Sequence, residues 1–282
     1  MKKKYGITFF ILLIISGFSN ISFAQDLDLE ALIMPPNSQA QDAMAQAEAN
    51  LDEIIDPLLD LFGFYTGGAS YHSAKVHGLG GFDVGVRVVT MLVSDDQKPD
   101  LPYPGNVGFN GGIFRDVTAV PLPIFQASLG LPGNLEATGR FFTYPLGEGE
   151  KKGNVTLVGL GVKYGLLQNL LLPRVAVVAN YHYLTVPTEF DFGTVNSFNT
   201  AIIVSKGFLL IDFYGGVGYN WNKLDVEIDL GPIGTLSKEY KKGNWRGNVG
   251  VKIKPFPLLF IHADYDFGPV KGFSAGLGVN FL

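Results

Sequence analysis

The chain has 282 residues, with 21 Lys and Arg against 26 Asp and Glu, and a formal net charge of −5. It contains no cysteine, which excludes disulfides, thiolate metal sites and cysteine nucleophiles. No basic patch stands out, so we expect no nucleic-acid partner. Hydrophobic residues make up 47% of the chain and mean hydropathy is +0.22. So many apolar side chains need either a large soluble core or contact with lipid.

The first 24 residues predict a secretory signal peptide. Lys2, Lys3 and Lys4 form a basic start, and residues 7–15 form a short apolar core. Ser22 and Ala24 then give a small-x-small cleavage site, with Gln25 as the first mature residue. The apolar run is too short for a membrane anchor and is followed by polar residues. We therefore expect an exported protein.

Residues 25–80 form a separate N-terminal segment with helical periodicity. Apolar residues recur at helical spacing from about 38 to 62, which predicts an amphipathic helix. Residues 26–62 hold nine acidic residues and no basic one. Two interpretations remain open for this helix. It docks on a periplasmic partner, or it enters a barrel as a plug whose acidic face meets luminal Arg and Lys.

From Gly81 onward the apolar period changes to two, which is the period of β-strands. The runs that we expect to form strands are 82–92, 123–131, 134–145, 153–167, 173–186, 195–207, 208–224, 238–254, 257–268 and 271–282. Residues 94–123 are rich in Pro and Gly and predict a long loop, and a short strand at 113–120 within it stays open. The fold predicted for 81–282 is all-β: a transmembrane antiparallel up-and-down β-barrel of about ten strands, within a range of 8–12.

A soluble β-sandwich has the same alternation with its apolar face turned inward. Strand length separates the two folds, because about ten residues suit a bilayer crossing, whereas five or six are common in soluble sheets. The runs above are mostly of the longer kind. Together with the signal peptide, they favour the membrane barrel.

The last strand carries the clearest pattern. Phe273, Ala275, Leu277, Val279 and Phe281 share one parity, and small or polar residues share the other. This arrangement resembles the C-terminal closing strand of bacterial outer-membrane barrels, although here the aromatic residue is penultimate. The resemblance implies outer-membrane lipid around the apolar face and barrel-assembly machinery as a partner of the strand.

The opposite parity carries the polar side chains that would line a lumen. The candidates are Asp83, Arg87, Glu136, Arg140, Lys163, Arg174, Asn180, His182, Asp212, Asn220, Arg246, Lys252, Lys254, His262, Asp264 and Asp266. Both charge signs occur in similar numbers, so no selective single-sign ring is expected. They form either a structural salt-bridge network, because unpaired buried charge is costly, or a permeation path of mixed charge.

Catalytic and metal sites find little support in the sequence. His72 and His77 are five residues apart, which places them on one face of neither a helix nor a strand. We therefore predict no metal site and no cofactor. His182 or His262 with a luminal serine would be needed for a membrane-embedded hydrolase, but no motif joins them, so we expect no enzyme.

The segment 63–86 resembles a motif of a family of exported, functionally uncharacterised proteins predicted to be outer-membrane barrels. The matching residues are Tyr71, Ala74, Lys75, His77, Gly81, Phe82 and Asp83. The family has no established activity to transfer. A helical segment before a barrel also looks like the architecture of long-chain fatty-acid transporters, although no motif is shared.

These features predict an outer-membrane barrel that admits or transports an unidentified small molecule, hydrophobic ones included. A non-conducting structural barrel is the alternative, and a lipid hydrolase is a more distant one.

Overall fold

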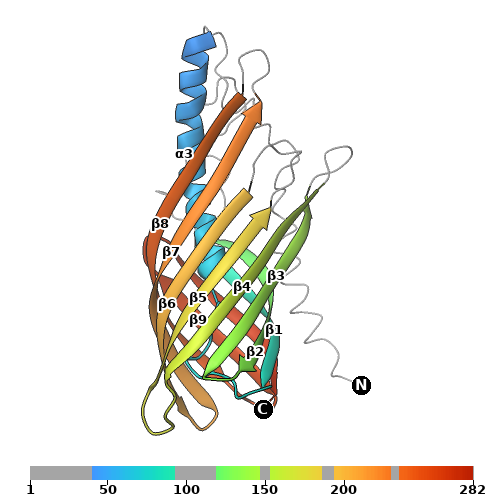
Figure 1. Ribbon diagram of the computed structural model, residues 1–282, viewed down its shortest axis with the longest axis vertical. Helices are drawn as coiled ribbons and strands as arrows, with labels where there is room; N and C mark the ends of the chain where they lie inside the picture. Colours follow the sequence, from blue (N-terminus) through green and yellow to red (C-terminus); the bar gives the residue numbers. More distant parts are fainter. Residues whose placement is uncertain (1–39, 93–118, 147–152, 186–193, 230–234, 282) are drawn as a thin grey trace.

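The computed structural model describes residues 40–92, 119–146, 153–185, 194–229 and 235–281. These residues form one long helix followed by ten strands (Figure 1). The elements are α3 (Ala40–Gly67), β1 (Phe82–Leu92), β2 (Ala119–Leu131), β3 (Leu135–Leu146), β4 (Gly153–Leu167), β5 (Arg174–Thr185), β6 (Thr194–Phe208), β7 (Ile211–Asp229), β8 (Thr235–Ile253), β9 (Leu259–Phe267) and β10 (Lys271–Phe281). The signal peptide predicted for residues 1–24 lies outside the described part of the chain.

The ten strands form a closed antiparallel barrel. Each strand pairs with its neighbours in sequence, and β1 pairs with β10 so that Phe82 lies opposite Phe281. Closure leaves no unpaired strand edge, which a bilayer requires because it offers no water to free backbone groups. The prediction of an up-and-down barrel of about ten strands is therefore confirmed, and the count is ten.

The strand boundaries differ from expectation mainly in β2, β7 and β8. β2 begins at Ala119, within the segment predicted as a loop. β7 and β8 are 19 residues each, and their pairing runs without interruption from Ile211↔Ile253 to Asp229↔Thr235. This hairpin extends past the other strands alongside α3 (Figure 1).

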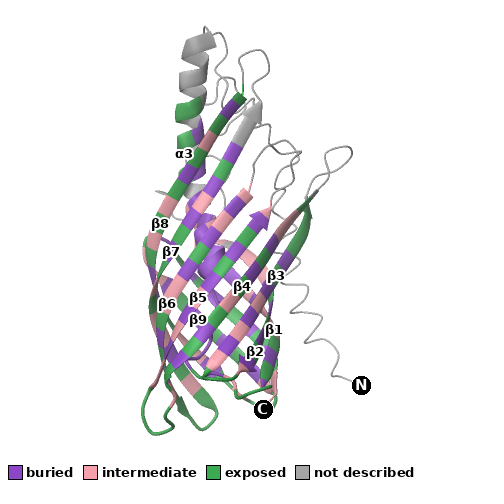
Figure 2. Ribbon diagram, viewed as in Figure 1, coloured by how far each residue is buried: buried purple, intermediate pink, exposed green. Residues whose placement is uncertain are grey.

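The outer face of the barrel is apolar. Exposed outward side chains include Leu160, Ile202 and Val249. Buried and exposed residues alternate along the strands (Figure 2). On β10, Leu277 points outward and Ser274 points inward, as predicted for this strand. An apolar surface of this extent would be unfavourable in water, but it suits the hydrocarbon of a membrane.

No helix in the described part of the chain is long and apolar enough to cross a bilayer.

The interior is apolar near one end of the barrel and polar near the other. At the apolar end, Leu51, Ile55 and Leu59 of α3 are buried in one cluster with wall residues. The wall residues of this cluster include Val89, Met91, Ile124, Phe142, Leu157, Leu184, Val195, Leu224, Val226 and Leu236. Burying each such helix side chain contributes roughly 1.5–3 kcal/mol. The apolar face of the helix thus packs on an apolar part of the wall.

α3 is longer than the predicted 38–62, because the helix continues past Gly63 to Gly67. A β-carbon on Gly63 would meet the side chain of Asn222 on β7. Glycine therefore allows the helix to approach the wall closely at this point. The helix ends where the Gly68 amide donates to the Phe64 carbonyl at 2.7 Å.

Candidate functional site

The end of α3 is held by two arginines of the barrel wall. Arg140, on β3, donates to the carbonyls of Thr66 and Gly68, the latter at 2.7 Å. Arg87, on β1, donates to the carbonyl of Ala69 at 3.1 Å. The last carbonyls of a helix lack partners within the helix and carry partial negative charge. The two guanidinium groups therefore satisfy and neutralise the end of α3 inside the barrel.

We call residues 59–80 the luminal segment. Its other residues also contact inward-facing side chains of the wall. Near its start, Thr66 Oγ1 lies 2.8 Å from Ser197 Oγ and Asn220 donates to the Gly63 carbonyl at 3.1 Å. Further along, Tyr71 Oη donates to Asn248 at 2.7 Å.

Beyond the end of the helix, backbone and side-chain groups of the luminal segment continue to pair with the wall. Ser73 Oγ donates to Asp212 at 2.6 Å, and the amide of Ala74 donates to Ser205 Oγ at 3.0 Å. Gln168 accepts from the amide of Val76 at 3.1 Å. The segment thus follows an irregular path whose polar groups are satisfied by the barrel.

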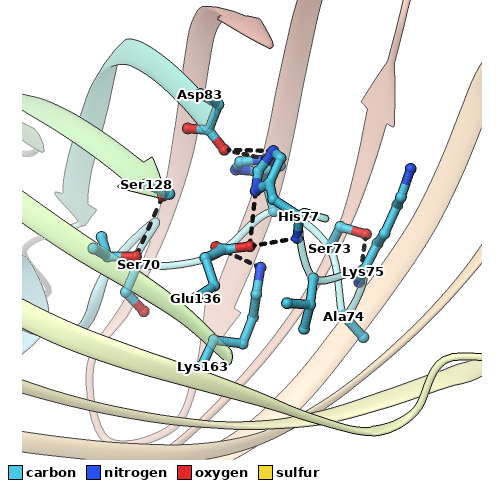
Figure 3. A network of polar contacts seen from close by, with 12 residues as sticks. Ser70, Ser73, Ala74, Lys75, His77, Asp83, Ser128, Glu136 and Lys163 are labelled. Atoms are coloured by element: carbon cyan, nitrogen blue, oxygen red, sulfur yellow. Dashed lines mark hydrogen bonds and ion pairs between the residues drawn. The ribbon is translucent and has the colours of Figure 1, made fainter. Parts of the chain in front are cut away.

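A charged cluster surrounds the last part of the luminal segment (Figure 3). Glu136 accepts from Lys163 at 2.7 Å and contacts His77 Nδ1 at 2.8 Å. Asp83 lies 3.5 Å from Arg87 and 3.5 Å from His77 Nε2. These side chains are almost fully buried, so their charges balance one another instead of being screened by water.

A second group of buried polar residues lies on β7, β8 and β9. Tyr214 donates to Asp264 at 2.7 Å and lies 3.3 Å from His262 Nδ1. Arg246 lies 3.3 Å from Asp266. Charges of opposite sign therefore meet between neighbouring strands here as well.

The structure places the predicted lumen-lining residues on the inward face. Buried ones are Asp83, Arg87, Glu136, Arg140, Lys163, His182, Arg246, Lys252, His262, Asp264 and Asp266. Arg174 and Asp212 are only partly buried. Glu136 and Lys163 are brought together, as are Arg246 and Asp266, whereas Arg140 faces backbone carbonyls rather than a carboxylate.

The acidic helix was expected to pair with Arg and Lys among the predicted lumen-lining residues. For its described acids this is wrong, because their partners are two other lysines, Lys238 and Lys242. Lys238 on β8 binds Glu48 and Asp52, each at 2.7 Å. Lys242 binds Asp56 and Asp60, each at 3.1 Å. These four acids lie in the middle turns of α3, which run beside the long β7–β8 hairpin, so Lys238 and Lys242 of the hairpin pair with them.

The environment of Asp52 matches this pairing. Partial burial acts to raise the pKa of Asp52, but hydrogen bonds from Lys238 and Tyr240, with the charge of Lys238, lower it below its usual value. The carboxylate is therefore favoured in its charged form at the surface of the hairpin.

The hydroxyl groups near the luminal histidines are engaged elsewhere. Ser197 contacts Thr66 and donates to Asn222 at 2.7 Å, and Ser274 donates to Asp266 at 3.4 Å. His182 lies 3.1 Å from Arg140. Over the described ranges, no group of three or more His, Asp or Glu side chains is arranged to hold a metal ion.

Sequence reasoning assigned no contacts to the residues that follow α3 in the luminal segment, although it named Tyr71 and His77 as part of a family motif. Tyr71, His72 and Ser73 belong to the site, yet they lie on neither a helix nor a strand, so periodicity gives no signal for them. His77 contacts Glu136 and also lies 2.8 Å from Asn280 on β10. The one available signal was the family motif spanning 71–83, whose residues meet the wall here.

Two small cavities border the luminal segment among the described residues. Each has a volume of about 10 Å³, one near Tyr71 and Asn180 and one near Phe64 and Asn244. Each has room for about one water molecule. In this conformation neither cavity gives a solute a path along the luminal segment.

Replacing Gly130 with alanine should disturb the exit of the luminal segment. Gly130 accepts from the Gly80 amide at 3.1 Å and donates to the Gly81 carbonyl at 2.7 Å. A β-carbon there would collide with the backbone carbonyl of Gly78. We expect Gly130→Ala to lower the unfolding midpoint in urea, measured in lipid vesicles.

The control is Gly139→Ala on the paired strand β3, where a β-carbon meets nothing within 4 Å. It should leave the midpoint in place. Equal effects of the two changes would contradict the close approach at Gly130.

Comparison with solved structures finds β-barrel proteins. The attachment invasion locus protein Ail of Yersinia pestis is 12% identical, with 72% of this chain and 98% of that chain covered and a TM-score of 0.29. The N-terminal barrel domain of Pseudomonas aeruginosa OprF is 10% identical, with 73% and 98% covered and a TM-score of 0.31. An outer membrane channel from Pseudomonas putida F1 is 9% identical, with 76% and 99% covered and a TM-score of 0.38.

At these identities and TM-scores, none of the three transfers a function to this chain. No curated protein matches the chain in sequence. A family model described as "Family of unknown function (DUF6588)" matches residues 1–100 and 103–281. The chain, an outer-membrane type β-barrel whose interior contacts its own N-terminal segment, therefore belongs to this family of unknown function.

Proposed function

We propose that the protein is an outer-membrane channel that its own luminal segment keeps closed, and that small molecules pass when this segment moves. The carrying observation is the bonding of Arg87 and Arg140 to the end of α3. These bonds are polar, and water can replace them once the segment leaves.

The polar wall supports a path for solutes. Asn180, Asn199, Asn220 and Asn248 face the interior beside small residues, and charges of both signs are paired across neighbouring strands. If the luminal segment withdrew, this half of the barrel would be a hydrophilic surface that water could wet. Mixed charge argues against strong ion selectivity.

A locked variant tests this function. The chain has no native cysteine, and Thr66 Oγ1 lies 2.8 Å from Ser197 Oγ. The double change Thr66→Cys and Ser197→Cys should therefore form a reversible disulfide between the luminal segment and β6. In planar lipid bilayers we expect discrete openings when it is reduced, as for the unmodified protein, and silence when it is oxidised.

A non-conducting structural barrel is the second candidate, favoured by the many contacts between the luminal segment and the wall and by the small volume of the two cavities described above. It predicts no openings in either redox state, and none for a chain that lacks residues 40–67. Conduction by that shortened chain would reject the structural role, whereas silence of all forms would reject the channel.

A further inference from the structure

The two ends of the barrel differ in the lengths of their connections. At one end, strands are joined by residues 132–134, 168–173, 209–210 and 254–258. At the other end, β1 and β2 are joined by residues 93–118, the longest connection in the barrel. Bacterial outer-membrane barrels have short turns on the periplasmic side and longer loops outside. The end that carries residues 93–118 is therefore the outer end.

The contacts of α3 and the luminal segment follow one direction along the barrel. β8 starts at the outer end with Thr235 and descends to Ile253 at the turn end. The successive contacts are Asp52 with Lys238, Asp60 with Asn244, Tyr71 with Asn248, and Ser73 with Asp212 near the lower end of β7. The chain thus descends from the outer end to the turn end (Figure 1).

The start of β1 completes this path. Gly80 and Gly81 pair with Gly130 next to the short turn at 132–134, and β1 begins at Phe82 opposite the last residues of β10. The segment therefore crosses the interior once, from the loop end to the turn end, before the first strand begins. A helix that entered from the periplasmic side would meet these wall residues in the reverse order.

We propose that the protein threads its own N-terminal segment through the barrel, so that the first turns of α3 are displayed on the outer surface of the membrane. The β7–β8 hairpin is the support for the displayed part. Its Lys238 and Lys242 hold four acidic residues of α3, and Glu48 and Asp52 keep about half of their side chains exposed.

Three single-cysteine variants of the full-length chain test this arrangement. Ala49→Cys places a thiol on an exposed position of α3. Lys241→Cys marks the loop end on β8, where the side chain is 72% exposed. Pro132→Cys marks the turn end at an exposed position. Intact cells are treated with a polyethylene-glycol maleimide too large to pass porins, and the same cells are treated again after the outer membrane is permeabilised.

We expect Ala49→Cys and Lys241→Cys to be modified on intact cells, and Pro132→Cys only after permeabilisation. An unmodified Ala49→Cys beside a modified Lys241→Cys would overturn the threading. Modification of Pro132→Cys on intact cells, or protection of Lys241→Cys, would overturn the orientation. Labelling does not depend on conduction, so failure here is distinguishable from failure of the channel function.

Discussion

Replacing Glu136 with alanine should lower the free energy of unfolding by about 3–5 kcal/mol, because removal of one partner leaves a buried charge without compensation. Lys163 would lose its 2.7 Å contact and His77 its 2.8 Å contact. Urea titration in lipid vesicles measures this, with fluorescence of Trp221 and Trp245, the two tryptophans, as the signal. Both are about half exposed on the outer face, where unfolding removes them from lipid.

Two further variants separate charge from packing. The double change Glu136→Leu with Lys163→Met should cost less than Glu136→Ala alone, because no unpaired charge remains. Glu239→Ala is the matched surface control, since Glu239 pairs with Lys223 and Lys241 on the exposed hairpin. It should leave the midpoint where it is, as exposed ion pairs contribute little. A double variant as unstable as Glu136→Ala would contradict the proposed role of the charge.

Replacing Arg140 with methionine should release the end of α3. Hydrogen bonds to a charged group contribute about 1.5–3 kcal/mol each, and Arg140 serves the carbonyls of Thr66 and Gly68. Loss of one such bond corresponds to roughly a 10–150-fold change in the equilibrium for local opening. Hydrogen exchange of amides in the last turns of α3 should accelerate by that order, and channel openings should become more frequent.

Arg174→Met is the control for this change. Arg174 lies on the same inward face but is only partly buried, and its β5 strand begins at the turn end, away from the end of the helix. It should leave exchange in α3 unchanged. If Arg140→Met also left exchange unchanged, the arginine would not hold the helix, and the mechanism of closure proposed above would lose its main contact.

Much of the barrel could be predicted because alternation is a local property. In β9, Leu259 and Ile261 lie on the opposite face from His262, and one strand suffices to show this. A run of about ten such residues then implies a bilayer crossing. The inward placement of Glu136, Arg140 and Asp266 follows from the same parity, without knowledge of any contact.

The height of a residue along the barrel could not be predicted in this way. Leu157 and Leu184 share the inward face with Lys163 and His182, yet they lie in the apolar layer around α3. The parity of a residue in its strand shows which face of the barrel its side chain lies on. It does not show which other element the side chain contacts. The apolar inward residues near the loop end therefore had no interpretation until the helix was found beside them.

The sequence by itself predicted an up-and-down membrane barrel of about ten strands, within a range of 8–12, and identified its inward-facing polar residues, because backbone geometry sends alternate side chains to opposite faces. The tertiary structure fixed the closure of the barrel and the count of ten strands. Only the tertiary structure decided what those residues meet. Arg140 bonds to the Gly68 carbonyl, 72 residues away in the chain, and Lys238 reaches Asp52, 186 residues away. Such partners depend on the register of every strand pair between them and on the path of the N-terminal segment. A short stretch of sequence therefore does not predict them.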